Sequence, residues 1–173
     1  MEALREPYPP DIDPGAEAPE SLDDVLDARF EHAEFANVRA IRSSLRRVEL
    51  RTCRLTGAEL AEASWQDVRA TDCRLDLAGL RYARLERVVF SDCILEEADF
   101  SAATLKDVLF ERCRLRLAVF SGATAERVQL IGCELEGLAG IESLRGVQMR
   151  WDDVVQNAPL FARALGIEIV EDE

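Results

Sequence analysis

Apolar side chains recur at every fifth position along most of this chain. Every fifth residue from Phe30 through Leu135 is apolar, and two residues before each of them stands a small residue. The small positions follow a longer period of four such units, so that the chain's five cysteines are Cys53, Cys73, Cys93, Cys113 and Cys133. Periodicity this strict predicts a repeat architecture.

A five-residue period excludes both common regular structures. Five steps of about 100° rotate each new apolar residue by about 140°, so a helix would have no fixed apolar face. A single long strand would turn its apolar side outward at every second unit, because strand side chains alternate with period two. A corner after each unit resolves this, and four sides then close one coil, which accounts for the longer period. The pattern predicts an all-β solenoid, a quadrilateral parallel β-helix of about 5–6 coils.

The stacked coils predict a core made of columns, because equivalent residues lie above one another. The cysteines form one inner column, and valines and alanines form the others. The large positions fill the centre, each contributing roughly 1.5–3 kcal/mol when buried. The predicted structural core is Cys53, Cys73, Cys93, Cys113, Cys133, Leu55, Leu75, Leu95, Leu115 and Leu135.

The repeated unit, as in Ala98-Asp99-Phe100-Ser101-Ala102, resembles that of the pentapeptide-repeat proteins. The resemblance covers about residues 28 to 138 and implies a right-handed coil. That family prefers Asp or Asn between the two inward residues, whereas here only Asp99 occupies such a position. The resemblance therefore implies the fold but not an acidic surface.

The two ends of the chain depart from the repeat. Residues 1–20 hold five of the six prolines and many acids, which predicts a disordered tail. Residues 21–150 are assigned to the β-helix. Residues 151–173 are assigned to a short α-helical cap with an extended end. The helical stretch is expected to run from Asp152 through Leu165, broken or restarted at Pro159, with Gly166 as its C-cap.

A solenoid needs a cap because its last coil otherwise exposes backbone edges and core. The run containing Ser143-Leu144, Gly146, Asp152-Asp153, Phe161-Ala162 and Gly166 resembles the C-terminal segment of the DNA-mimicking, gyrase-binding fluoroquinolone-resistance members of that family. The resemblance implies a homodimer through this segment, and a monomeric cap is the alternative. Trp151, Leu160, Phe161 and Leu165 are the candidate dimer or cap residues.

The sequence offers no catalytic constellation. The five thiols lie in one straight column, so they do not converge as a zinc site requires, and their parallel Cβ vectors do not suit a disulfide. The single histidine, His32, falls at an outward corner without a nucleophile or paired acid placed beside it by the spacing. We therefore expect no enzyme activity, no metal and no cofactor.

The formal net charge of −13 comes from the ends of the chain. Residues 28–140 hold 18 acids and 17 bases, whereas residues 1–27 carry a net −8 and residues 141–173 a net −4. Close mimicry of duplex DNA over about 27 Å would require some 16 excess negative charges. The outward column of Arg54, Arg74 and Arg114 is interrupted by Ile94 and Glu134, which favours a solvated face over direct nucleic-acid binding.

Several apolar residues point outward in the predicted coil. They are Val89, Ile94, Leu109, Leu117 and Val119. Scattered exposed aliphatic residues are ordinary, whereas a contiguous patch would indicate a protein partner or second subunit.

These observations favour a non-catalytic protein-interaction scaffold with an unknown partner. The alternative, implied by the C-terminal resemblance, is a DNA-mimicking modulator of a type II topoisomerase, DNA gyrase. No apolar run approaches the roughly 18 residues of a membrane span, and the acidic N-terminus is unlike a signal peptide. We therefore expect a cytoplasmic protein without membrane partners.

Overall fold

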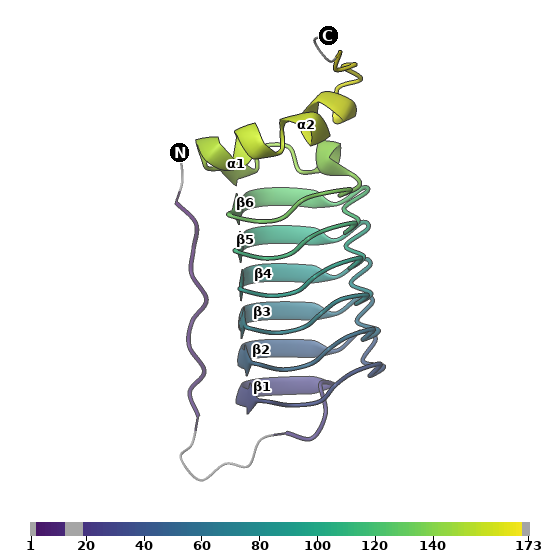
Figure 1. The fold of residues 1–173 in the computed structure, drawn as a ribbon. Helices are drawn as coiled ribbons and strands as arrows, with labels where there is room; N and C mark the ends of the chain where they lie inside the picture. The colour runs from purple at the N-terminus through teal and green to yellow at the C-terminus, as the bar shows by residue number, and fades with distance from the viewer. Residues whose placement is uncertain (1–2, 13–18, 171–173) are drawn as a thin grey trace.

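The computed structural model of this protein describes residues 3–12 and 19–170, and most of them form a stack of four-sided coils (Figure 1). Two adjacent sides of the stack, with the corner between them, form a parallel sheet of seven strands in chain order. Neighbouring long strands are offset by one full repeat, so that Val48 aligns with Val68 and Val68 with Val88. The strands are β1 (Asp24–Glu31), β2 (Ser44–Arg51), β3 (Ser64–Thr71), β4 (Arg84–Ser91), β5 (Thr104–Glu111), β6 (Thr124–Ile131) and β7 (Gln148–Met149).

The remaining sides of each coil pair through single parallel bridges. Arg54 bridges to Arg74 and Glu59 to Gly79, and both series continue upward with the same offset. Their backbone groups therefore find partners in the coil above and below, as buried or edge backbone requires. The parallel, four-sided β-solenoid predicted from the period of five is confirmed.

Each corner uses a left-handed backbone conformation two residues after a large core residue. Thr52 follows Leu50 with φ of 52°, and Glu62 follows Leu60 with φ of 59°. At the second of these the Ala63 N–H closes a turn on the Leu60 carbonyl at 3.2 Å. A left-handed non-glycine residue costs of order 1–3 kcal/mol, so the packing of the coil must outweigh a strain repeated at nearly every corner.

The core runs the length of the stack and is filled with side chains. All ten residues of the predicted structural core are buried. The aromatic residues stack between coils: the rings of Phe90 and Phe110 lie 5.1 Å apart and nearly parallel, and those of Phe100 and Phe120 lie 4.8 Å apart. Such pairs contribute about 0.5–1.5 kcal/mol beyond area burial. The coil interior therefore has no room for a ligand.

A cap of short elements covers the last coil (Figure 1). It comprises a 3₁₀ turn (Ile141–Ser143), β7, α1 (Trp151–Gln156) and α2 (Ala158–Ala164). The helical stretch breaks at Asn157, and α2 begins at Ala158, one residue before the predicted restart at Pro159. The Asn157 side chain and N–H both donate to the Asp153 carbonyl, at 2.8 and 3.1 Å. Gly166, with φ of 71°, follows the second helix as expected. Residues 171–173, the last of the predicted extended end, lie outside the described residues.

Side chains from the cap satisfy open N–H groups of the top coil. The Gly122 N–H donates to Ser143 Oγ at 2.9 Å, and the Gly132 N–H donates to Asp153 Oδ2 at 3.0 Å. Asp153 is itself buried. The cap thus closes the upper edge by hydrogen bonding as well as by covering the core.

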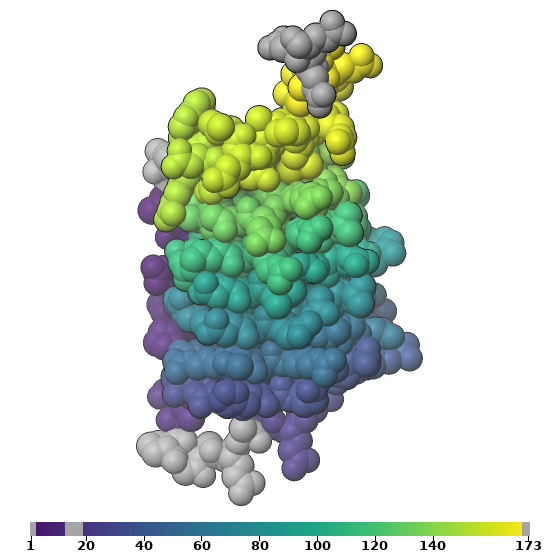
Figure 2. All heavy atoms as spheres, viewed as in Figure 1, coloured from purple at the N-terminus to yellow at the C-terminus, as the bar shows by residue number. Residues whose placement is uncertain are grey.

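Residues 3–12, which belong to the tail predicted to be disordered, lie along the outside of the coils (Figures 1 and 2). The disorder of residues 1–20 stays a prediction. Residues 3–12 are held by backbone N–H groups that donate to aspartates of three different coils. Residues 1–2 and 13–18, on which the same prediction falls, lie outside the described residues. Within the described part of the chain, no helix is long and apolar enough to span a membrane.

Candidate interaction surfaces

One corner of the coil carries acids and arginines in strict alternation. It is the corner inside each long strand, and we call its six residues the charge ladder: Asp27, Arg47, Asp67, Arg87, Asp107 and Arg127. Each arginine reaches down to the aspartate of the coil before it. Arg87 grips Asp67 through Nε to Oδ1 at 2.6 Å and Nη2 to Oδ2 at 3.0 Å, and Arg127 grips Asp107 at 2.6 and 2.9 Å. Two-bond pairs of this kind are the stronger form of ion pair.

The ladder is partly withdrawn from water. The Asp107 side chain is fully buried and that of Arg127 is 14% exposed. The hydrogen bond from Arg127 lowers the pKa of Asp107 below its ordinary value. The hydrogen bond from Arg47 lowers the pKa of Asp27 to about 2. Asp27 and Asp107 therefore remain ionised at neutral pH and act as hydrogen-bond acceptors.

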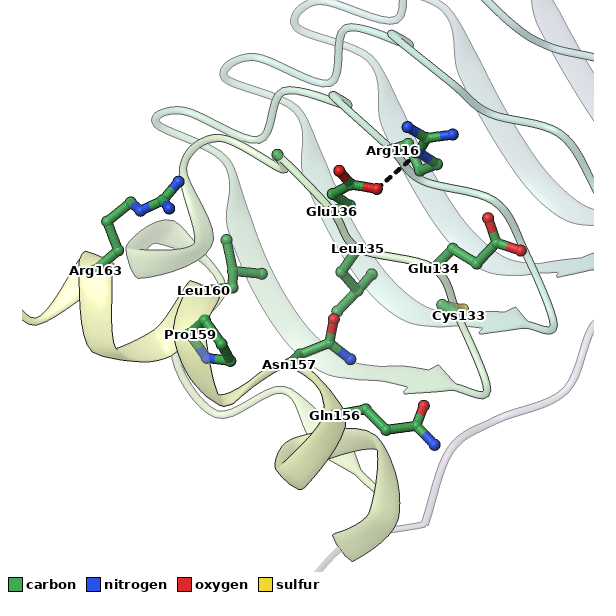
Figure 3. A pocket seen from close by; sticks show the side chains of 11 residues that line it. Arg116, Cys133, Glu134, Leu135, Glu136, Gln156, Asn157, Pro159, Leu160 and Arg163 are labelled. Carbon is green, nitrogen blue, oxygen red and sulfur yellow. Dashed lines mark ion pairs between the residues drawn. The ribbon is translucent and has the colours of Figure 1, made fainter. Parts of the chain in front are cut away.

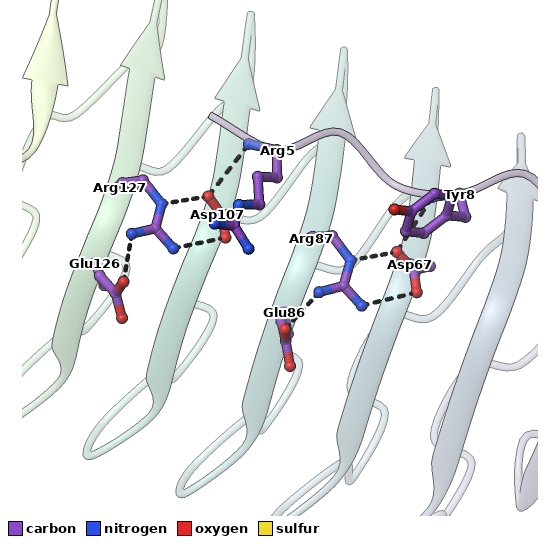
Figure 4. A network of polar contacts seen from close by, with 8 residues as sticks. All are labelled: Arg5, Tyr8, Asp67, Glu86, Arg87, Asp107, Glu126 and Arg127. Carbon is purple, nitrogen blue, oxygen red and sulfur yellow. Dashed lines mark hydrogen bonds and ion pairs between the residues drawn. The ribbon is translucent and has the colours of Figure 1, made fainter. Parts of the chain in front are cut away.

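The N-terminal segment, residues 3–12, uses these acceptors (Figure 4). The N–H groups of Arg5, Tyr8 and Asp11 donate to Asp107, Asp67 and Asp27 at 3.2, 3.1 and 3.0 Å. Sequence reasoning missed this contact. Two features of the sequence point to this contact: the charge at this corner alternates in sign from one coil to the next, and prolines lie between the three donor residues.

Side chains of the same segment add two further contacts. Glu6 forms an ion pair with Arg69 at 3.6 Å. The Tyr8 ring lies against Arg87, whose guanidinium carbon is 5.8 Å from the ring centre, within the range of a cation–π contact.

Several other outward charges are also paired between neighbouring coils. Arg29 contacts Glu49 at 2.7 Å, and Arg112 contacts Asp92 through two bonds of 2.7 Å. Further pairs with the same one-coil offset are Arg39–Glu59, Arg42–Glu62, Arg54–Glu34, Arg114–Glu134 and Arg116–Glu136. Exposed pairs contribute little stability, about 0–1 kcal/mol each. They do neutralise the acids that a mimic of DNA would present as free negative charge.

The cysteine column is a lining of the core. Each thiol points at the backbone of the preceding coil, as Cys93 does with its Sγ 3.4 Å from the Ala70 carbonyl. The neighbouring Cys113 and Cys73 thiols, together with burial, raise the pKa of the Cys93 thiol, which disfavours the reactive thiolate. Among the described residues, no group of three or more His, Cys, Asp or Glu side chains is arranged to hold a metal ion.

The five outward apolar residues differ in exposure. Leu117 is 54% exposed, whereas Val89 is only 3% exposed. Ile94, Leu109 and Val119 are half-buried. Val89 belongs to β4, the strand that the N-terminal segment crosses between its hydrogen bonds to Asp107 and Asp67. Its position in the fold is therefore beside the charge ladder.

The cap has apolar residues on two sides. Leu160 and Phe161 pack against the core at the open end of the last coil. Trp151 and Leu165 point into solvent and are 77% and 76% exposed, and Val155, Ile167, Ile169 and Val170 are also exposed. Figures 1 and 2 show that α1 lies across the top coil and that the yellow end of the described chain projects beyond it. The four candidate residues thus divide into a capping pair and an exposed pair.

A recess lies between the last coil and α2 (Figure 3). Arg116 and Glu136 pair across part of it at 3.2 Å, and Leu135, Asn157 and Leu160 contribute other walls. Cys133 also lines it, but its thiol donates to the Phe110 carbonyl at 3.3 Å. The recess therefore lies where α2 packs on the last coil.

Comparison with known proteins identifies the repeat. Residues 63–139 match the family model described as the pentapeptide repeat region. Two solved structures of QnrB1, a plasmid-mediated fluoroquinolone resistance protein, are similar to this chain, and both are trypsin-treated forms with a single substitution. One is 21% identical with a TM-score of 0.65, and the other is 20% identical with a TM-score of 0.58. Both alignments cover 87% of this chain and 84% of the other. The comparison with curated protein sequences gave no match.

Proposed function

We propose that this chain, whose coils contain a pentapeptide repeat region, is a non-catalytic protein-interaction scaffold that pairs with a second copy through its cap. The observation that carries the proposal is the exposed apolar surface of residues 151–170. Exposed apolar area of this kind usually marks a contact with another protein. The filled core, which leaves the outer surface as the part available to other molecules, supports the non-catalytic assignment.

The division of apolar residues in the cap supports a role beyond closing the solenoid. Capping needs only the inward side, where Leu160 and Phe161 pack. The side chains of Trp151, Val155 and Leu165 are exposed to solvent, so they contribute little packing to a single copy of the chain. Burying such side chains contributes about 1.5–3 kcal/mol each. Two copies meeting at this end would cover the same patch on both, as a twofold interface does.

Light scattering after size-exclusion chromatography tests the pairing. We expect a dimer for the unaltered chain and monomers for Trp151→Arg and Leu165→Arg, because a charge would enter the apolar contact. Leu77→Arg is the matched control, since Leu77 is 56% exposed on a coil corner far from the cap, and it should remain dimeric. A monomeric unaltered chain at about 100 μM, where an interface with a micromolar Kd would be filled, contradicts the pairing.

A modulator of DNA gyrase is the second candidate. The fold similarity to QnrB1, a fluoroquinolone resistance protein, and the C-terminal resemblance favour it. The pairing of outward acids with arginines of adjacent coils weighs against mimicry of a phosphate backbone. A supercoiling assay with purified gyrase, with and without a fluoroquinolone, separates the two. Inhibition or drug protection at micromolar protein would favour the topoisomerase role, and no effect would leave the scaffold role.

A further inference from the structure

We propose that the charge ladder is a binding site for polyproline II peptides that carry a backbone N–H at every third residue. The chain's own N-terminal segment is the ligand that occupies it in this structure. The site consists of Asp27, Asp67 and Asp107, each held by the arginine of the next coil, and it is independent of the cap surface.

Two unrelated lengths agree at this site. The coils repeat at a strand spacing of about 4.8 Å, so aspartates on every second coil are separated by about 9.6 Å. A polyproline II helix rises about 3.1 Å per residue with three residues per turn, or about 9.3 Å per turn. The three donors, Arg5, Tyr8 and Asp11, stand at every third position and meet aspartates that lie two coils apart. One turn of the peptide therefore spans two coils.

Other peptide conformations do not satisfy this spacing. A β-strand advances about 3.3 Å per residue but alternates its faces with period two, so every third N–H points to the opposite side. An α-helix advances only about 1.5 Å per residue and uses its own N–H groups internally. Polyproline II has no internal hydrogen bonds, and every third residue shares one face. The ladder selects this conformation.

The prolines of the segment fall where no N–H is needed. All three prolines lie between donor positions: Pro7 between Arg5 and Tyr8, and Pro9 and Pro10 between Tyr8 and Asp11. Proline lacks an N–H but fixes φ at about −65°, which preorganises the extended helix. The sequence therefore combines a stiffened backbone with donors at the three positions that face aspartate.

The acceptor side is prepared by the arginines. The Oδ1 atom of Asp67 accepts both the Tyr8 N–H at 3.1 Å and Arg87 Nε at 2.6 Å. Oδ1 of Asp107 likewise accepts the Arg5 N–H and Arg127 Nε. The arginine fixes the carboxylate before the peptide arrives, and bonds to a charged acceptor are stronger than neutral ones. The Glu6–Arg69 pair gives the bound peptide a preferred direction.

The solenoid does not depend on its ligand. The core cluster extends from Leu22 to Leu144 and contains no residue of the N-terminal segment. The contacts between the segment and the coils include three hydrogen bonds to ladder aspartates, an ion pair with Arg69 and one ring contact with Arg87. A chain that lacks residues 1–20 therefore retains its complete core and presents an unoccupied ladder.

The experiment measures binding of a fluorescent peptide of residues 3–12 to the chain lacking residues 1–20, by anisotropy. We expect saturable binding, with at least about 10-fold weaker apparent affinity for the full-length chain, in which the tethered segment competes. The Tyr8→Pro peptide should bind at least about 10-fold more weakly, because it lacks the N–H that Asp67 accepts. The Tyr8→Ala peptide keeps this donor and should bind within about threefold of the original.

Matched changes in the protein complete the design. Asp67→Ala should abolish binding, whereas Asp92→Ala should not, although Asp92 is held by two bonds from Arg112 in the same way on another corner. A thermal melt of each variant verifies folding. The proposal is overturned if the peptide fails to bind at about 1 mM, if Tyr8→Pro has no effect, or if a scrambled peptide of equal charge binds as well.

Hydrogen exchange on the full-length chain provides a test that needs no truncation. The amide of Tyr8 should exchange at least about 10-fold more slowly than that of Glu6, and Asp67→Ala should remove the difference. Equal exchange rates for the two amides in the unaltered chain would overturn the proposal.

Discussion

In one coil a large residue, Trp65, is accompanied by a small one, Ala70. Replacing both residues together is therefore a sharp test of the core packing. Both side chains are fully buried on β3. In the neighbouring coils the column of Trp65 holds Leu45 and Leu85, and the column of Ala70 holds Leu50 and Phe90. The Trp65 ring lies 6.0 Å from the Phe90 ring, one coil above Ala70. The indole therefore extends toward the space that a larger residue at position 70 would fill.

The expected energies follow from these contacts. Replacing a buried Trp by Ala costs about 3–5 kcal/mol, and leucine retains about 2.4 kcal/mol of that through its additional carbon atoms. Trp65→Leu alone should therefore lower the free energy of unfolding by about 2 kcal/mol. Ala70→Leu alone should cost about 1–3 kcal/mol through overpacking.

The double variant should lie within about 1 kcal/mol of the unaltered chain, because the new leucine at position 70 enters the space that the ring leaves. It also removes the Trp65 Nε1, which has no hydrogen-bond partner among the described residues. Urea unfolding followed by far-UV circular dichroism gives all four free energies. Additivity of the single changes within about 0.5 kcal/mol would refute the volume exchange. Leu77→Ala, on an exposed corner, should change stability by less than about 0.5 kcal/mol.

Three further changes test the core, the ladder and the cap junction. Cys93→Val should cost less than about 1.5 kcal/mol because it keeps a small apolar side chain in the column and adds only about one carbon. Cys93→Arg should abolish cooperative melting because it buries an unpaired charge, and a soluble, cooperatively melting Cys93→Arg protein would refute the inward register. Hydrogen bonding by Arg47 lowers the pKa of Asp27 to about 2. The contribution of this pair to stability is therefore complete above the ordinary pKa of about 4 and is lost as pH falls toward 2. In thermal melts from pH 5 to 2 the melting temperature of Asp27→Asn should fall less steeply than that of the unaltered chain, and parallel curves would contradict this. Gly140 has φ of 78°, and a Cβ there would lie 2.6 Å from the Phe120 carbonyl carbon. Gly140→Ala should therefore lower the melting temperature by several degrees. An unchanged melting temperature would show that the backbone between the last coil and the cap can shift to accept the methyl group.

The repeat made the coil predictable from the sequence. A period of five admits few structures, and each cysteine and leucine of the core could be assigned to a column from its number alone. The same rule placed the outward charges on faces and indicated that the coils are nearly neutral. The structure adds how this neutrality arises, through pairs such as Arg112 with Asp92 in adjacent coils.

The contacts of the N-terminal segment were not predictable in the same way. Composition alone describes residues 1–20 as a proline-rich acidic tail, and such tails are commonly disordered. The contacts of residues 3–12 join parts of the chain that lie far apart in the sequence, so neither part reveals them by itself. Val89 is a second case, since the repeat places it outward while the folded chain leaves it buried.

The cap was predictable in kind but not in detail. A solenoid end requires cover, and the helical stretch was expected. The position of the break depended on Asn157, whose side chain bonds the Asp153 carbonyl, and on Asp153, whose carboxylate is anchored to the top coil. Both contacts connect the cap to a specific place on the fold, so local propensity could not locate them.

Because aspartate and arginine alternate along the charge ladder, the full sequence repeat of this molecule is two coils long. The backbone returns to the same position after one coil, but an aspartate returns to the same corner only after two. Inserting or deleting one coil would place two aspartates or two arginines against each other and would shift the N-terminal segment out of register. Growth or shortening of this protein by duplication and loss of sequence should therefore proceed in pairs of coils, with one three-residue turn of the N-terminal segment added or removed for each pair.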